Sequence, residues 1–249
     1  MACNNTFSIF KDTIFENSST DLIKWMYAIH LFLNGKKGIS ALQLQREIGV
    51  TYKTAWRMLR QIRVAMGSED MQDFFKGTLE MDETYVGGKP RKGNKKDKND
   101  KNKPGRGTAK KPVVGIIDRD SKKVHAKVAM PNKEGRKLTG NQLVAILNQV
   151  AKTNSLIMTD EFKGYNLLRN RGFRHLRVDH SKEYANGHIH TNNIECFWSM
   201  LKRGIYGIYH QVSLKYLQQY VNEFCFRYNN KDNANAFDLL LEQSVLLNR

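Results

Sequence analysis

The fold of this chain is built around one stretch, Thr78-Leu79-Glu80-Met81-Asp82-Glu83-Thr84-Tyr85-Val86-Gly87-Gly88. Its apolar, aromatic and β-branched residues favour a strand. Side chains of a strand alternate between its two faces, so Glu80 and Asp82 share one face and Glu83 lies on the other. Because an unpartnered carboxylate is costly to bury, the strand must place these acids at a solvated rim, pair them or give them a metal ion. On spacing alone, a solvated acid is the commonest outcome.

The segments that follow predict an α/β fold. Residues 113–118 and 124–130 have the pattern of two strands joined by a turn, and with 78–86 they predict an antiparallel meander. Next come a helix over 139–153, a strand over 155–159, a helix over 161–171, a strand over 173–178 and a long amphipathic helix that begins after Thr191. This order is that of the ribonuclease-H-like (RNase H-like) fold. Two further helices, 214–227 and 236–247, are expected to cover the sheet.

An all-α segment precedes the sheet. Apolar periodicity and capping residues predict helices over 22–34, 40–48 and 52–66, and a tight turn at Gly49 joins the last two. This pattern is typical of a helix-turn-helix, whose second helix enters the major groove of DNA. The alternative is a three-helix bundle whose basic face is only solvated. The residues of the second helix expected to contact DNA are Lys53, Thr54, Arg57 and Arg60.

The charge of the chain indicates a polyanionic partner. The formal net charge is +17 over 249 residues, with a pI near 9.8, which favours nucleic acid over a membrane surface. No apolar run is long enough to span a bilayer, and no signal peptide is recognisable. Three cysteines without pairable spacing predict a reduced, cytoplasmic protein. A basic loop over 89–112 with no large apolar residue is expected to follow phosphates, through lysines that include Lys92, Lys95 and Lys96.

Three acids occupy related places in the expected fold. Asp82 lies inside the first strand, Asp160 follows the fourth strand, and Glu195 lies on the long helix. The first and fourth strands are neighbours in an RNase H-like sheet, so Asp82 and Asp160 are expected to be adjacent. Such carboxylates can hold two Mg²⁺ or Mn²⁺ ions for phosphoryl transfer. The alternatives are acids paired with the many cations and a solvated Glu195. Three histidines, at 180, 188 and 190, are expected to be solvated or to contact phosphate rather than to bind a metal.

Three blocks of this sequence resemble a known family: 81–88 (MDETYVGG), 159–165 (TDEFKGY) and 190–206 (HTNNIECFWSMLKRGIY). They are similar to DDE transposases of bacterial insertion sequences, in the ISXO2-like branch with a zinc ribbon, a helix-turn-helix and a retroviral-integrase-type catalytic domain. The resemblance implies Asp82, Asp160 and Glu195 as the catalytic, metal-binding residues, with Asn193 as a rival for the third place. It also implies contacts from Lys202 and Arg203 to the DNA end.

The implied activity is Mg²⁺-dependent cutting of the element's ends and joining of their 3′-OH groups to target DNA. The implied partners are double-stranded DNA, as terminal inverted repeats and target, and further copies of the chain in a dimer or larger assembly. The implied location is the bacterial nucleoid. Two other functions stay open: a DNA-binding regulatory protein without catalysis, and a structure-selective nuclease of the same fold.

The expected domains are a remnant of the ribbon at 1–20, the helix-turn-helix at 21–70, the catalytic domain at 77–230 and a C-terminal helix at 231–249. The sequence departs from the family pattern at its start, where Cys3 stands in the place of the last ribbon ligand. One thiolate cannot build a four-ligand zinc site, so most of the ribbon is expected to be missing.

Overall fold

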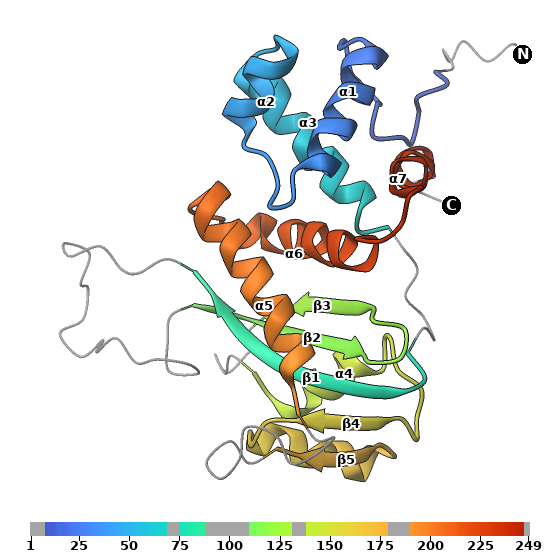
Figure 1. Ribbon diagram of the computed structural model, residues 1–249, viewed down its shortest axis with the longest axis vertical. Helices are drawn as coiled ribbons and strands as arrows, with labels where there is room; N and C mark the ends of the chain where they lie inside the picture. The colour runs from blue at the N-terminus through green and yellow to red at the C-terminus, as the bar shows by residue number, and fades with distance from the viewer. Residues whose placement is uncertain (1–7, 69–74, 88–109, 131–137, 179–189, 247–249) are drawn as a thin grey trace, which may run out of the picture. The chain divides into compact units, whose positions relative to one another are not determined.

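The computed structural model describes residues 8–68, 75–87, 110–130, 138–178 and 190–246 (Figure 1). The chain forms two compact units, one of Met1–Glu69 with Asn230–Arg249 and the other of Asp70–Asn229. In the described ranges, no helix has the length and apolarity needed to cross a membrane. Several residues singled out in the sequence lie outside these ranges, namely Cys3, Lys92, Lys95, Lys96, His180 and His188.

The larger unit is built on a five-stranded sheet. Its strands are β1 (Thr78–Val86), β2 (Lys111–Asp118), β3 (Val124–Val128), β4 (Leu156–Thr159) and β5 (Arg174–Arg177), in the order β3-β2-β1-β4-β5. The pairs β1–β2 and β2–β3 are antiparallel, whereas β4 runs parallel to β1 and β5 runs parallel to β4. This topology confirms the predicted RNase H-like fold, including the neighbouring first and fourth strands.

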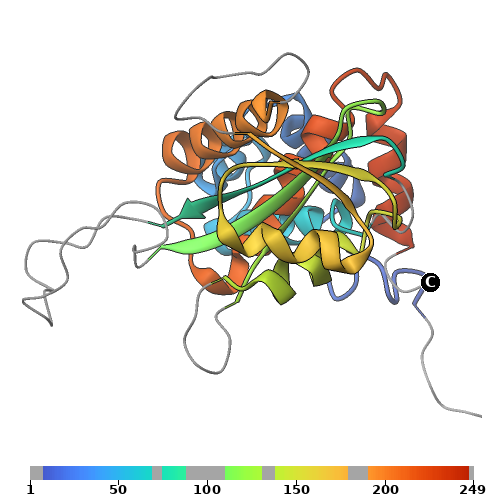
Figure 2. The same ribbon diagram turned by 90° about the horizontal axis from the view of Figure 1, so that it is seen from below.

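Helices cover both faces of this sheet (Figure 2). One face packs on α4 (Gly140–Leu147) and the 3₁₀ helix η2 (Lys163–Arg171), and the other packs on α5 (Asn192–Gly204) and α6 (Leu214–Asn229). The alternation of β1 assigns its residues to these layers, since Leu79 and Met81 lie in the α4 core. Glu80 and Asp82 therefore face α5, as their hydrogen bonds to that helix also show.

Two helices are shorter than the sequence predicts. The helix expected over 139–153 ends at Leu147, after which the backbone tightens to bonds between residues three apart. This tightening allows Val150 to accept a hydrogen bond from the Phe75 backbone N–H at 3.1 Å. The helix expected over 161–171 is a 3₁₀ helix that begins at Lys163, because the Asp160 side chain first accepts the Phe162 N–H and holds a turn.

The smaller unit contains α1 (Leu22–Asn34), α2 (Ala41–Ile48), α3 (Tyr52–Ala65) and α7 (Ala236–Val245). Ser40 and Thr51 cap α2 and α3 as expected, by accepting the N–H groups of Gln43 and Thr54. Gly49 ends α2 in the left-handed region at φ 62°, which joins the two helices by the expected tight turn. The prediction that the last helix covers the sheet is wrong for α7. This helix belongs to the smaller unit, where it packs on α1 and α3.

Candidate metal centre

Three carboxylates meet where β1 and β4 run side by side. The parallel register pairs Met81 with Thr159, so the next residues, Asp82 and Asp160, are neighbours at the same edge. Glu83 joins them, and one carboxylate oxygen from each of the three residues lies within 4.8 Å of the others. All three side chains are partly buried. The expected adjacency of Asp82 and Asp160 is therefore present, together with a third acid, Glu83, which strand alternation predicts on the opposite face.

Glu83 reaches this acid group from the opposite face of the strand. The Tyr165 hydroxyl donates a hydrogen bond to Glu83 Oε2 at 2.7 Å, from the layer that contains η2. Strand alternation had set Glu83 apart from Asp82. The signal that could have identified Glu83 is that it directly follows Asp82 at the point where the pairing of β1 with β4 ends.

The carboxylate of Asp82 lies in an unfavourable environment for negative charge. Burial raises the pKa of Asp82 from 3.8 to about 7, with further contributions from the charges of Glu83 and then Asp160. The Trp198 indole opposes this effect by donating a hydrogen bond to Asp82 Oδ2 at 3.0 Å. Burial and the same three acids raise the pKa of Tyr165 well above its usual value of 10. The site is therefore electronegative and poorly solvated, as a cation site should be.

The other two candidates for this centre lie at the start of α5. Glu195 is exposed, its Oε1 accepts a hydrogen bond from Thr191 Oγ1 at 3.2 Å, and it is not in the acid group found among the described residues. Asn193 donates from both its backbone N–H and its side-chain amide to Glu80. The roles predicted for Glu195 and Asn193 stay predictions. In the structure, the partner of Asn193 is the carboxylate of Glu80.

Residues 74–229, which hold the sheet and the acid group, match the ISXO2-like transposase domain. The chain belongs to the ISXO2-like transposase family. An uncharacterized protein in transposable element ISH50 of Halobacterium salinarum is 29% identical over 254 residues, which cover 98% of this chain and 82% of that protein. An uncharacterized transposase-like protein of Haemophilus influenzae is 29% identical over 98 residues, 39% of this chain and 79% of the relative.

Solved structures of Mos1 transposase are also similar. The Mos1 strand transfer complex aligns with a TM-score of 0.35 at 11% identity, over 98% of this chain and 81% of the Mos1 chain. The Mos1 paired-end complex with the left transposon end aligns with a TM-score of 0.33 at 10% identity, over 98% and 82% of the two chains. The assignment of this chain to its family rests on the domain match and on its own sheet topology.

The transposase carries the two basic residues predicted to meet DNA, Lys202 and Arg203, in the last turn of α5. Arg203 Nε donates to the Ser199 carbonyl at 3.2 Å. His190, the described member of the three histidines, lies with its Nδ1 3.4 Å from Glu80 Oε1. DNA contacts by Lys202 and Arg203 stay predictions.

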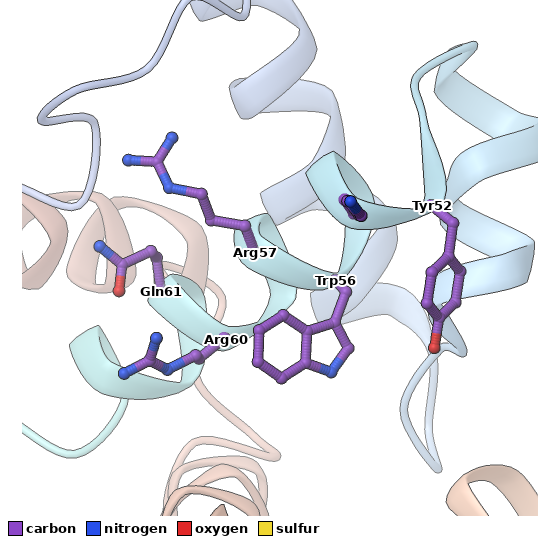
Figure 3. A pocket seen from close by; sticks show the side chains of 6 residues that line it. Tyr52, Trp56, Arg57, Arg60 and Gln61 are labelled. Atoms are coloured by element: carbon purple, nitrogen blue, oxygen red, sulfur yellow. The ribbon is translucent and has the colours of Figure 1, made fainter.

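The smaller unit of the transposase presents a hollow of about 400 Å³ along α3 (Figure 3). Two aromatic rings, of Tyr52 and Trp56, contribute to its lining. Lys53 and Arg60, two of the predicted DNA contacts, also line it and are exposed. The full lining is Tyr52, Lys53, Trp56, Arg57, Arg60 and Gln61. A cationic surface with aromatic rings suits contact with nucleic acid.

The other two predicted contacts on α3 are engaged within the smaller unit. Arg57 donates from its guanidinium to the backbone carbonyls of Glu16 and Asn17, so it braces the segment before α1. Thr54 shares a hydrogen bond with the Thr51 hydroxyl at 3.0 Å. Lys53 and Arg60 are exposed whereas Arg57 and Thr54 are half-buried, so the first two have better access to a phosphate backbone.

Proposed function

We propose that this member of the family is a divalent-metal-dependent DNA transposase that cuts the ends of its element and joins the 3′-OH groups to target DNA. The observation that carries the proposal is the meeting of Asp82, Glu83 and Asp160 at one edge of an RNase H-like sheet. A partly buried acid whose pKa is raised by burial and by neighbouring acids, as that of Asp82 is, is a frequent mark of a functional site.

The donor set fits the ion that such chemistry needs. Carboxylate oxygens are hard ligands that suit Mg²⁺ or Mn²⁺ and do not favour zinc. Asp82 and Asp160 would hold the ion, and Glu83 is close enough to contribute an oxygen. When bound, a divalent ion polarises the phosphoryl oxygens and lowers the pKa of an attacking hydroxyl or water.

Neighbouring side chains keep these acids in place. The Trp198 indole fixes one oxygen of Asp82, and the Tyr165 hydroxyl fixes one oxygen of Glu83. Their rings also exclude water from that side of the site, which strengthens the attraction between the acids and a cation. Glu195 stays the proposed third catalytic residue, with Asn193 as its rival, because both lie in the first turn of α5.

Basic side chains of the transposase are proposed to bind the DNA. Lys53 and Arg60 on α3 and the lysines of the 89–112 loop are proposed to bind phosphates of the terminal repeats and the target. Lys202 and Arg203, at the end of α5, are proposed to hold the DNA end near the acids. Because two element ends must be joined, a dimer or larger assembly of the transposase is proposed to act.

The proposal is tested with a duplex that carries the inverted repeats flanking the gene. Wild-type transposase with Mg²⁺ or Mn²⁺ should nick this duplex and join the new 3′ ends to a plasmid, and EDTA should abolish both products. Asp160→Ala should lose both activities and keep DNA binding. Equal activity of Asp160→Ala and wild type would refute the assignment. Nicking without joining would indicate a nuclease, and DNA binding without nicking would indicate a regulatory protein.

Glu195→Gln and Asn193→Ala, measured in the same assay, separate the two candidates for the third place. Loss of activity in Asn193→Ala alone would exclude Glu195. DNA affinity measured against salt concentration tests the basic loop, since deletion of 89–111 should flatten that dependence.

A further inference from the structure

Glu80 is a fully buried carboxylate with a complete set of hydrogen-bond donors. Its relative exposure is 0%. Oε1 accepts from Arg119 Nε at 2.7 Å and from Asn193 Nδ2 at 2.7 Å. Oε2 accepts from the backbone N–H groups of Asn193 at 2.9 Å and Ile194 at 3.1 Å. Each oxygen thus uses both of its acceptor positions, which accounts for a charge that is tolerated in the interior.

This arrangement makes a β-strand residue the cap of a distant helix. The first N–H groups of an α-helix have no partner within the helix and lie at its positive end. The residue before α5, Thr191, makes no side-chain capping bond. Glu80 satisfies two of these N–H groups from a position 113 residues earlier in the chain. The start of α5 is therefore attached directly to β1.

A second attachment lies one helical turn further along α5, where Trp198 donates to Asp82. Residues two apart on one face of a strand are separated by about 6.6 Å. Residues four apart on a helix, such as Ile194 and Trp198, are separated by about 6 Å along its axis. Because these spacings match, Glu80 and Asp82 contact consecutive turns of α5.

Gly115 of β2 permits the second contact. It pairs with Asp82 across the sheet, and a Cβ added to it would lie 2.6 Å from the ring of Trp198. Any larger residue would displace the indole from the position in which it reaches Asp82.

We propose that Glu80 is a positioning residue for the metal centre. It fixes the first turn of α5 on β1. It thereby keeps the Trp198 indole hydrogen-bonded to Asp82 and fixes the backbone position of Glu195 relative to the acid group. This inference rests on the proposed function, because the centre that Glu80 positions is the acid group of Asp82, Glu83 and Asp160. It also gives Asn193 a definite role, which is to bind Glu80 and not the metal ion.

The first test uses Glu80→Gln and a matched control, Glu223→Gln, in the full-length chain. Glu223 is also fully buried and is held by Arg227 Nε at 3.0 Å and by the Tyr209 hydroxyl at 2.8 Å. A glutamine at position 80 keeps the volume but presents an amide donor either to Arg119 or to the N–H groups of α5. Both variants should lower the melting temperature, because each disrupts a buried charged network.

Two measurements separate positioning from general stability. The first is the ¹⁹F NMR spectrum of the protein labelled with 5-fluorotryptophan. The sequence has three tryptophans, so the spectrum is simple, and the Trp198→Phe variant identifies the Trp198 resonance. The second is Mn²⁺ affinity from titration calorimetry. Glu80→Gln should shift the Trp198 resonance and weaken Mn²⁺ binding about tenfold or more, as loss of a supporting hydrogen bond to a metal site typically does. Glu223→Gln should leave both at wild-type values.

Asn193→Asp is the second test, and it retains a side chain at a partly exposed position where misfolding is not expected. The new carboxylate faces Glu80, so the two repel, the start of α5 is released and the Trp198 resonance should shift without a gain in Mn²⁺ affinity. If Asn193 were a metal ligand, a charged oxygen in its place would bind Mn²⁺ about tenfold or more tightly, and this result would overturn the inference. An unshifted Trp198 resonance in both Glu80→Gln and Asn193→Asp would overturn it as well.

The outcomes distinguish this inference from the proposed function. A wild-type chain that binds no Mn²⁺ and cuts no DNA would refute the metal-dependent transposase. The Trp198 resonance can be recorded on metal-free protein, so it still shows whether Glu80 holds α5 on β1. Conversely, normal Mn²⁺ affinity in Glu80→Gln with an active wild type would leave the proposed function standing and remove the role of Glu80.

Discussion

The raised pKa of Asp82 predicts how the stability of the metal-free protein depends on pH. In the unfolded chain the pKa of this carboxyl returns to about 3.8, whereas in the folded protein it is about 7. The folded state therefore holds a proton that the unfolded state has released, and stability falls as pH rises from about 4 through 7. The difference of about three pKa units corresponds to about 4 kcal/mol of unfolding free energy.

The assay is urea denaturation of wild type and Asp82→Asn between pH 4 and 8, at constant ionic strength with EDTA. The comparison with the variant is necessary because burial lowers the pKa of His125 to about 4, and this group gives the opposite slope in the same window. Subtracting the Asp82→Asn curve removes the contribution of His125. Wild type should lose up to about 4 kcal/mol relative to the variant from pH 4 to 7, with little further change above pH 8.

A divalent ion should cancel this loss. Because the ion binds ionised carboxylates, saturating Mn²⁺ should stabilise wild type far more at pH 8 than at pH 5, and should have little effect on Asp82→Asn. Parallel curves for wild type and Asp82→Asn in EDTA would refute the reasoning about the buried acid. Equal stabilisation of the two proteins by Mn²⁺ would show that the ion binds elsewhere.

Three further predictions concern single residues. Gly115→Ala should destabilise the protein by about 1–3 kcal/mol in thermal denaturation, because the new methyl group would clash with the Trp198 ring. The control Gly207→Ala should change stability little, because no atom lies within 4 Å of its new carbon. Similar melting temperatures for both variants would contradict the close approach of α5 to β2. Arg57→Ala should lower stability by about 1–2 kcal/mol through its lost carbonyl contacts. Lys53→Ala, at an exposed position of the same helix, should instead keep its melting temperature, weaken DNA binding and reduce the slope of log affinity against log salt by about one. A change in stability without a change in DNA affinity would remove Lys53 from the DNA surface.

The sheet and part of its acid site follow from local patterns in the sequence. Alternation and turn residues identify β1, β2 and β3, and the order of elements then places β4 beside β1. Once this neighbourhood is known, Asp82 and Asp160 are expected to be adjacent, because the parallel pairing of β1 with β4 ends at Met81 and Thr159, one residue before each acid. Capping residues such as Ser40 and Thr51 fix the start of their helices by contacts within one turn, so they too are predictable.

The features that were missed depend on contacts between distant segments. The sequence pattern predicts no role for Glu80, because its partners Arg119 and Asn193 lie 39 and 113 residues away in the chain. Helical periodicity placed Arg57 on an outer face, but its guanidinium reaches carbonyls about 40 residues earlier. Strand alternation separated Glu83 from Asp82, although both side chains reach the same acid group at the edge of the sheet. In each case the tertiary arrangement, and not a local preference, determines the partner.

Anomalous diffraction from crystals grown with Mn²⁺ tests the central claim most directly. The account predicts a Mn²⁺ peak bonded to carboxylate oxygens of both Asp82 and Asp160, and no such peak in crystals of Asp160→Ala. A Mn²⁺ peak that is held by other residues, or one that persists at this position in Asp160→Ala, would contradict it.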